Sequence, residues 1–277
     1  MRQLAITIGV VFLAASINTP AQDTPTNSPA SRPAASRSQA DCTGFIASPA
    51  VSTDMYVLGG ADDDTHSPVR QFPIGHSIFI ANRKGETVTV GTQYSLVRIA
   101  GNLFETRRYA GQEWALHSVG KPYEDVGRAT VTHVNPDGIV AEVNFACSPV
   151  APGDLAIPFQ PRPIPEYTLN PRLDVFAPVK ESKKRQFIVA TRNNFGFVGK
   201  DDIVYLNIGE AEGVKTGQRY RVIKLLPPHA RGFLWTVHTP PETLGEAVVL
   251  SVQAKSSVAI IVDSYREISS GDAVEAE

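Results

Sequence analysis

VGRATVTHVNPDGIVAEVNFACSPVAPGDLAIPF, residues 126–159, aligns without a gap with LGEAVVLSVQAKSSVAIIVDSYREISSGDAVEAE, residues 244–277, at a constant offset of 118 positions. A second block, residues 77–98 against 203–224 at an offset of 126, precedes it in the same order. A duplicated unit of about 120 residues predicts two copies of one domain, each near the usual single-domain size. Eight of the 34 pairs in the first alignment are identical, and these are Gly127/Gly245, Ala129/Ala247, Val131/Val249, Val134/Val252, Val140/Val258, Ala141/Ala259, Gly153/Gly271 and Asp154/Asp272.

The apolar residues of each copy follow the two-residue period of β-strands and are rich in branched side chains. Five short strands per copy, separated by turns, predict an all-β fold with two tandem copies of a small SH3-like antiparallel barrel and short or no helices. A β-sandwich is the alternative, and the one helical candidate is residues 111–117. The expected strands are residues 78–80, 94–97, 129–134, 140–145 and 155–157 in copy one, and 203–206, 220–223, 247–252, 258–262 and 273–277 in copy two.

The first residues have the pattern of an export signal. Arg2 gives a positive start, residues 4–15 are apolar, and Thr19-Pro20-Ala21 is a small-residue cleavage site. Twelve apolar residues are too few to span a bilayer, and no second long apolar stretch follows. We therefore expect a periplasmic or secreted protein without a transmembrane segment after signal removal.

The composition of the remaining chain indicates two segments outside the predicted domains, a tether and a linker. Residues 22–41 are rich in Pro, Ser and Ala and predict a disordered tether, because they offer little apolar surface to bury. The alternate prolines Pro161, Pro163 and Pro165 predict an extended linker over residues 160–173. The predicted organisation is a signal peptide over 1–21, the tether over 22–41, β-domain copy one over 42–159, the linker over 160–173 and copy two over 174–277.

The net charge of the chain indicates whether nucleic acid is an expected partner. The formal net charge is −2, and it becomes −3 without the signal because Arg2 is removed. No basic excess is present to neutralise phosphates, so the sequence predicts no nucleic-acid partner.

The chain contains two cysteines, Cys42 at the start of copy one and Cys147 near its end. Export to an oxidising compartment favours a disulfide between them. Two buried or unpaired thiols are the alternative. Tyr265 takes the place of Cys147 in copy two.

Copy two also carries a family resemblance. The segments DIVYLN at residues 202–207, GVKTGQRYRV at 213–222 and LGEA at 244–247, with the closing Gly271-Asp272, resemble a domain of uncharacterised exported bacterial envelope proteins. This domain is similar to the C-terminal domain of flagellar assembly protein T and to the region that follows LysM modules in some envelope proteins. Copy one keeps Gly91, Tyr94 and Gly153-Asp154 but lacks the Gly-Val-Lys-x-Gly turn. The resemblance implies a fold and an envelope location and no catalytic residues, and without a LysM module it does not imply peptidoglycan binding.

Sequence motifs for chemistry are absent. The sequence has no nucleophile elbow, Walker loop, dinucleotide-binding glycine loop, His-Glu-x-x-His helix or paired Cys-x-x-Cys knuckle. We therefore expect no enzyme activity, no catalytic residues, no cofactor and no metal. Asp62-Asp63-Asp64 is the best candidate for a hard cation, but it lacks the spacing of an EF-hand loop and is more simply a solvated loop.

Aromatic residues lie in the long connection between the second and third predicted strands of each copy. Phe104, Tyr109 and Trp114 lie in copy one, and Trp235 and Phe233 lie in copy two. These side chains either close the end of the barrel or form a contact surface for a partner or a glycan. The leading hypothesis is a non-enzymatic exported cell-envelope protein that serves as an adaptor or assembly component with an envelope protein partner. The alternative is a protein that binds peptidoglycan or a surface glycan through these loop aromatics.

Overall fold

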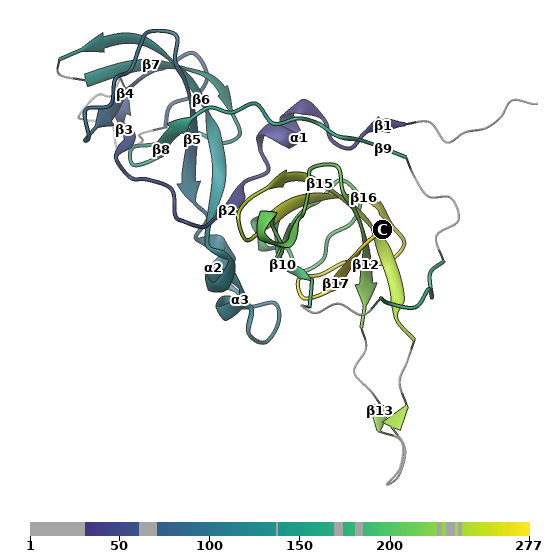
Figure 1. Cartoon of the computed structure of the whole chain (residues 1–277). Helices are drawn as coiled ribbons and strands as arrows, with labels where there is room; N and C mark the ends of the chain where they lie inside the picture. The colour runs from purple at the N-terminus through teal and green to yellow at the C-terminus, as the bar shows by residue number, and fades with distance from the viewer. Residues whose placement is uncertain are drawn as a thin grey trace, which may run out of the picture. The chain divides into compact units, whose positions relative to one another are not determined.

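A computed structural model describes residues 31–60, 71–136, 138–168, 174–180, 185–225, 229–230, 236–237 and 240–277. These residues form mostly antiparallel β-structure with short helices (Figure 1). The predicted all-β fold with two tandem small barrels is confirmed. The predicted signal peptide and the Asp62–Asp64 loop lie outside the described residues.

The first barrel is a curled sheet whose pairings return to their start. Its strands pair in the cyclic order β3–β4–β7–β6–β5–β8, and the single pair Tyr56↔Leu155 joins β8 to β3. A further strand, β2 (Phe45–Ala47), adds to β6. The strands of the cycle are β3 (Met55–Gly60), β4 (Ser77–Asn82), β5 (Gln93–Ile99), β6 (Lys121–Asn135), β7 (Gly138–Ala146) and β8 (Leu155–Pro158).

The second barrel repeats this order with six strands of its own. The cycle is β10–β11–β16–β15–β12–β17, and the bridge Phe187↔Ala273 closes it. Its strands are β10 (Ile188–Thr191), β11 (Ile203–Leu206), β12 (Arg219–Lys224), β15 (Glu242–Val252), β16 (Ser257–Ser264) and β17 (Ala273–Ala276). A separate small hairpin pairs β13 (His229–Ala230) with β14 (Thr236–Val237).

Residue pairing follows the sequence repeat. Tyr94 pairs with Ala129 in the first barrel, and the equivalent Tyr220 pairs with Ala247 in the second. The β-bulge after Leu96 recurs after Val222, and the bulges of β6 against β7 recur in β15 against β16. Equivalent residue pairs of the two barrels are therefore separated by the same offsets as the aligned sequences. The register is fixed in both barrels, because a slip of one residue would turn every core side chain outward.

The repeated Gly127 and Gly245 lie where two strands approach closely. A Cβ atom on Gly127 would come within 2.4 Å of the Phe145 carbonyl oxygen, and one on Gly245 within 2.3 Å of the Asp263 carbonyl oxygen. Real Cβ atoms do not make such contacts. These positions therefore require glycine, which explains their identity in the two copies.

The repeated Asp154 and Asp272 close equivalent turns. The Asp154 carboxylate accepts a hydrogen bond from the Ala151 amide at 2.7 Å, and Asp272 accepts one from the Ser269 amide at 2.8 Å. Each also binds a cation on the neighbouring strand, which is Arg98 at 2.6 Å for Asp154 and Lys224 at 2.8 Å for Asp272. A buried carboxylate with these partners is satisfied, so both aspartates have structural roles.

Each barrel encloses its own apolar core, and a third apolar cluster lies between them. The first core includes Ile78, Leu96 and Val131, and the second includes Leu206, Val222 and Val249. The third cluster combines side chains of both barrels with those of the segment 31–44, which we call the N-terminal arm. Its fully or largely buried members include Ala34, Phe45, Ile46, Leu116, Tyr123, Val189, Tyr205, Val248, Leu250 and Ile260.

Each barrel contains one strand more than the sequence predicts. Each barrel has six strands rather than five, because β3 and β10 also belong to it. These two strands correspond at an offset of 131, with matching bulges after Val57 and Ile188, so they lie outside the gap-free repeats. Without the repeat, the short β10 and the glycine-ended β3 give weak strand signals.

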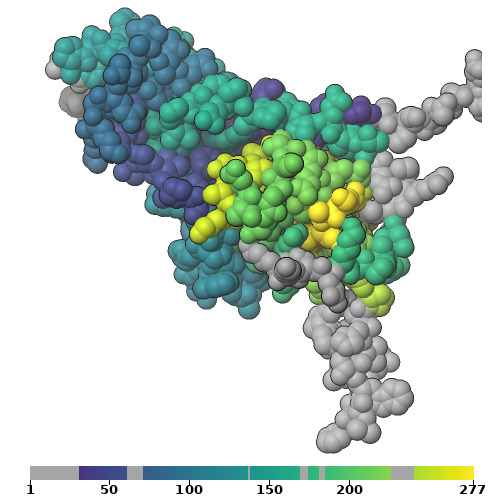
Figure 2. Space-filling model, viewed as in Figure 1, coloured from purple at the N-terminus to yellow at the C-terminus, as the bar shows by residue number. Residues whose placement is uncertain are grey.

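Part of the predicted tether is ordered, in contrast to the sequence expectation of disorder. Residues 31–41 contain β1 (Arg32–Pro33) and α1 (Arg37–Asp41), and β1 pairs with β9 (Glu166–Tyr167) of the linker. Ser36 caps α1 in a reciprocal capping box with Gln39. Figures 1 and 2 show the proline-containing segment lying against α1, and the Ala34 amide donates to the Pro165 carbonyl oxygen at 2.9 Å.

Two helices lie between β5 and β6. They are α2 (Asn102–Glu105) and α3 (Gln112–Val119), and α3 coincides with the predicted helical segment. The second barrel has two single 3-10 turns, Arg192–Asn194 after β10 and Glu210–Glu212 after β11.

We predict that Gly245→Ala lowers the free energy of unfolding by about 1–3 kcal/mol, because the added Cβ would force the paired strands apart. Urea unfolding followed by circular dichroism measures this change. The control is Gly101→Ala, since Gly101 has φ −62° and no atom within 4 Å of an added Cβ. A Gly245→Ala protein as stable as the control would contradict the close approach.

Candidate functional site

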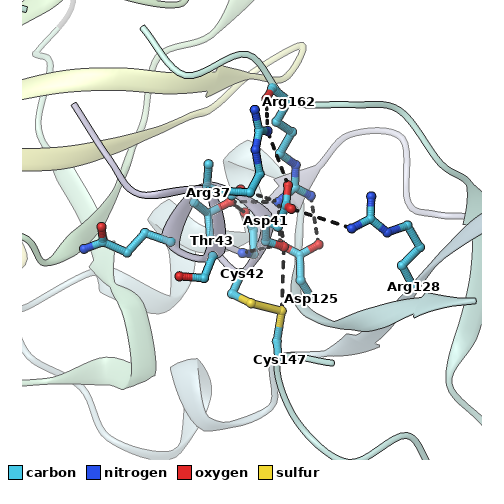
Figure 3. The surroundings of a disulfide bond; sticks show 12 residues. Arg37, Asp41, Cys42, Thr43, Asp125, Arg128, Cys147 and Arg162 are labelled. Atoms are coloured by element: carbon cyan, nitrogen blue, oxygen red, sulfur yellow. Dashed lines mark hydrogen bonds and ion pairs between the residues drawn. A yellow bond between two sulfur atoms is a disulfide. The ribbon is translucent and has the colours of Figure 1, made fainter. Parts of the chain in front are cut away.

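The disulfide joins the N-terminal arm to the first barrel (Figure 3). Cys42 ends α1, and Cys147 follows β7, with 5.6 Å between their Cα atoms. The predicted pairing is confirmed. Structural disulfides are typical of proteins outside the reducing cytoplasm, which fits a non-cytoplasmic protein.

A buried ion pair lies beside the disulfide. Arg162 binds Asp125 with two hydrogen bonds, Nη1 to Oδ2 at 2.6 Å and Nη2 to Oδ1 at 2.8 Å (Figure 3). Arg162 also donates to Thr43 Oγ1 at 3.0 Å, and the Gly44 amide donates to Asp125 at 2.7 Å. Burial opposes the charge of Arg162, but the hydrogen bonds and the charge of Asp125 outweigh it and raise the pKa of Arg162. This pair attaches the predicted linker to the first barrel, and sequence reasoning missed it because nothing local links the two residues.

The predicted aromatic residues have different environments. Trp114 on α3 is 77% exposed. Tyr109 points inward, donates from its hydroxyl to the Val189 carbonyl oxygen at 3.3 Å and lies edge-on to Phe187. Burial raises the pKa of Tyr109 to about 12. Its contacts with Val189 and Phe187 show that the ring packs against the second barrel. Trp235 and Phe233 lie outside the described residues.

Further exposed aromatic side chains lie on segments next to Trp114. Phe104 of α2 stacks on His117 of α3 with 5.4 Å between the ring centroids and is 38% exposed. Phe195 and Phe197, from the loop after β10, are 53% and 67% exposed. We call Phe104, Trp114, Phe195 and Phe197 the aromatic surface. Phe195 and Phe197 were not predicted from the sequence, because their loop belongs to no strand pattern.

Asn194 fixes the loop of the second barrel to the helices of the first. Its side-chain amide donates to the carbonyl oxygens of Asn102 at 3.0 Å and Thr106 at 2.9 Å. In return, the Arg108 guanidinium donates to the Asn194 carbonyl oxygen. These hydrogen bonds hold the two segments of the aromatic surface side by side.

A shallow depression lies beside Trp114. It is lined by Arg107, Gly111, Glu113 and His117, and Arg107 forms an ion pair with Glu113. An exposed indole ring next to charged donors and acceptors can contact both apolar and polar ligand groups.

A carboxylate cluster lies on the second barrel. Glu246 on β15 is 1% exposed, and Arg219 binds both it, at 3.2 Å, and Glu277, at 2.7 Å. Burial, together with the negative charge of Glu277, raises the pKa of Glu246 to about 7, although Arg219 opposes this shift. The equivalent residue of the first barrel is Arg128, which lies over the rings of Phe145 and Phe159.

Neither a metal centre nor a spanning helix is found in the described ranges. No group of three or more His, Cys, Asp or Glu residues there could hold a metal ion. No helix of the described chain is long and apolar enough to cross a membrane.

No protein-family model matches this chain, and no curated protein matches it. The resemblance to the C-terminal domain of flagellar assembly protein T therefore stays a prediction.

We predict that replacing both cysteines, Cys42→Ser with Cys147→Ser, lowers the free energy of unfolding by about 4 kcal/mol. Removing the cross-link restores the loop entropy of 105 residues to the unfolded chain. Urea unfolding with and without a reductant measures the effect. Reductant should destabilise the native chain and leave the double variant unchanged. Equal stability of native and double-variant proteins without reductant would contradict the disulfide.

We predict that Glu246→Gln changes the pH dependence of stability. Because the folded-state pKa of Glu246 is raised above its unfolded value of about 4.5, its stabilising contribution is complete below that value and is lost as pH rises through about 7. Thermal melts between about pH 4 and 8 should show the native protein losing stability relative to Glu246→Gln. The control is Glu142→Gln at an exposed strand position. Parallel curves for native protein and Glu246→Gln would contradict the prediction.

Proposed function

We propose that this protein is a non-enzymatic component of the cell envelope that binds another envelope protein through the aromatic surface. The observation that carries the proposal is the exposure of four large aromatic side chains, Phe104, Trp114, Phe195 and Phe197, on adjacent segments of both barrels. Exposed aromatic groups of this kind mark interaction sites, and Trp is enriched among residues that dominate binding energy.

The closed strand order favours binding through the side chains of the aromatic surface. The alternative is a partner that adds a strand to the edge of a sheet. In both cycles every strand is paired on each side, with the final contacts at Tyr56↔Leu155 and Phe187↔Ala273. Such barrels leave little free edge for a partner strand. Side chains outside the barrel cores are then the available contact groups.

The proposed location is the periplasm or the extracellular space. The apolar start of residues 1–21 supports export, and the Cys42–Cys147 disulfide supports an oxidising compartment. A double barrel that carries a contact surface made by both of its halves suits an adaptor or assembly role.

A second candidate function is glycan binding, favoured by the depression beside Trp114. The Arg107–Glu113 ion pair and His117 supply polar groups next to the exposed indole, an arrangement suited to a sugar ring and its hydroxyl groups. Peptidoglycan or a surface glycan would be the ligand.

We predict that Trp114→Ala together with Phe197→Ala abolishes the capture of a specific protein from envelope extract by the purified chain. Quantitative mass spectrometry of the captured material measures this, and the recovered partner should bind the native chain at least tenfold more tightly than the variant when both are purified. Phe176→Ala, which changes another exposed ring, is the matched control.

The same proteins separate the two candidate functions. Sedimentation with purified sacculi that depends on Trp114, without a protein partner, would favour the glycan. Capture that is unchanged in the double variant would contradict the aromatic surface as the binding site.

A further inference from the structure

A polar cavity lies where the two barrels and the disulfide meet, and we call it the interbarrel cavity. Its volume is about 220 Å³. This is somewhat below the range of about 300–1,000 Å³ that is typical for drug-sized ligands, so the cavity suits a smaller molecule. It is lined by both cysteines of the disulfide and by residues that include Asn102, Glu124, Asp125, Ser148, Arg192 and Tyr205.

One cation in this wall has no partner. Arg192 follows β10, is half-buried, and makes no hydrogen bond or ion pair with any residue that the structure describes. Most other cavity groups are satisfied: Asp125 is bound by Arg162 and the Gly44 amide, and the Tyr205 hydroxyl donates to the Thr43 carbonyl oxygen at 2.8 Å. A guanidinium without a partner in a partly enclosed cavity is a ready site for a carboxylate.

The carboxylate of Glu124, which also lines the cavity, lacks the close cation that binds its counterpart in the second barrel. Glu124 corresponds to Glu242 of the second barrel, which binds Arg266 at 2.8 Å. The position of Arg266 is occupied by Ser148 in the first barrel. Glu124 is left with a long contact to Arg98 at 3.5 Å. The hydroxyl of Ser148 is buried and has no hydrogen-bond partner in the described structure.

The two charges act on the same part of the cavity. Burial raises the pKa of Tyr205, and the charges of Glu124 and Arg192 act on this hydroxyl in opposite directions. Arg192 without a partner among the described residues, the weakly paired Glu124, the unsatisfied Ser148 hydroxyl and the buried Tyr205 therefore line one cavity. This set is complementary to a small molecule that carries both charges.

We propose that the interbarrel cavity binds a free α-amino acid as a zwitterion, with its carboxylate at Arg192 and its ammonium group at Glu124. The unsatisfied Ser148 hydroxyl supplies a further hydrogen bond to the ligand. The interbarrel cavity and the aromatic surface have no residue in common.

The test is isothermal titration calorimetry of the oxidised chain with glycine, L-alanine, D-alanine, L-serine and L-glutamate. At least one of these should bind saturably. Its N-acetyl derivative, which lacks the ammonium charge, and its amide, which lacks the carboxylate, should each bind at least tenfold more weakly. Both comparisons use the native protein and do not depend on a variant that folds.

Variants assign the two charges to residues. Arg192→Gln and Glu124→Gln should each weaken binding at least tenfold, with circular dichroism and melting temperature verifying the fold. Arg83→Gln, which changes an arginine that lies over Tyr56 of the first barrel, should bind as the native chain does. Absence of binding for all five amino acids up to 10 mM, undiminished binding of both derivatives, or full affinity in Arg192→Gln would overturn the proposal.

Discussion

Apolar contact between the two barrels is the constraint on which the other features depend. The third cluster brings Leu116 and Tyr123 of the first barrel together with Val248 and Ile260 of the second. Burying a side chain of this size contributes about 1.5–3 kcal/mol, so the cluster favours a single arrangement of the barrels. The aromatic surface and the interbarrel cavity both use residues from the two barrels, and both therefore exist only while this contact is formed.

Polar groups add specificity to that contact. The Tyr205 hydroxyl binds the Thr43 carbonyl oxygen, and the Ser256 hydroxyl binds the Ile46 carbonyl oxygen at 2.7 Å. The disulfide and the Arg162–Asp125 pair then attach the N-terminal arm and the linker to the first barrel. Such buried hydrogen bonds are costly to leave unmade, so they select one register of the contact.

The two barrels share a scaffold and differ in the chemistry that it carries. Glycines, bulges and turn aspartates recur at equivalent positions, because each meets a backbone requirement of the barrel. Charges at equivalent positions have diverged: Arg128 corresponds to Glu246, and Ser148 corresponds to Arg266. The sequence could therefore predict the barrels and the disulfide from periodicity and from cysteine count. It could not predict the ordered arm, the inward turn of Tyr109 or the charges of the cavity, because these depend on contacts between residues that no local pattern connects.

Differential scanning calorimetry of the oxidised chain tests most directly whether the two barrels form one cooperative unit. We expect a single transition whose calorimetric enthalpy equals its van't Hoff enthalpy, because the third cluster couples the unfolding of both barrels. Two resolved transitions, or a calorimetric enthalpy about twice the van't Hoff value, would show that each barrel unfolds alone and that the third cluster does not couple them.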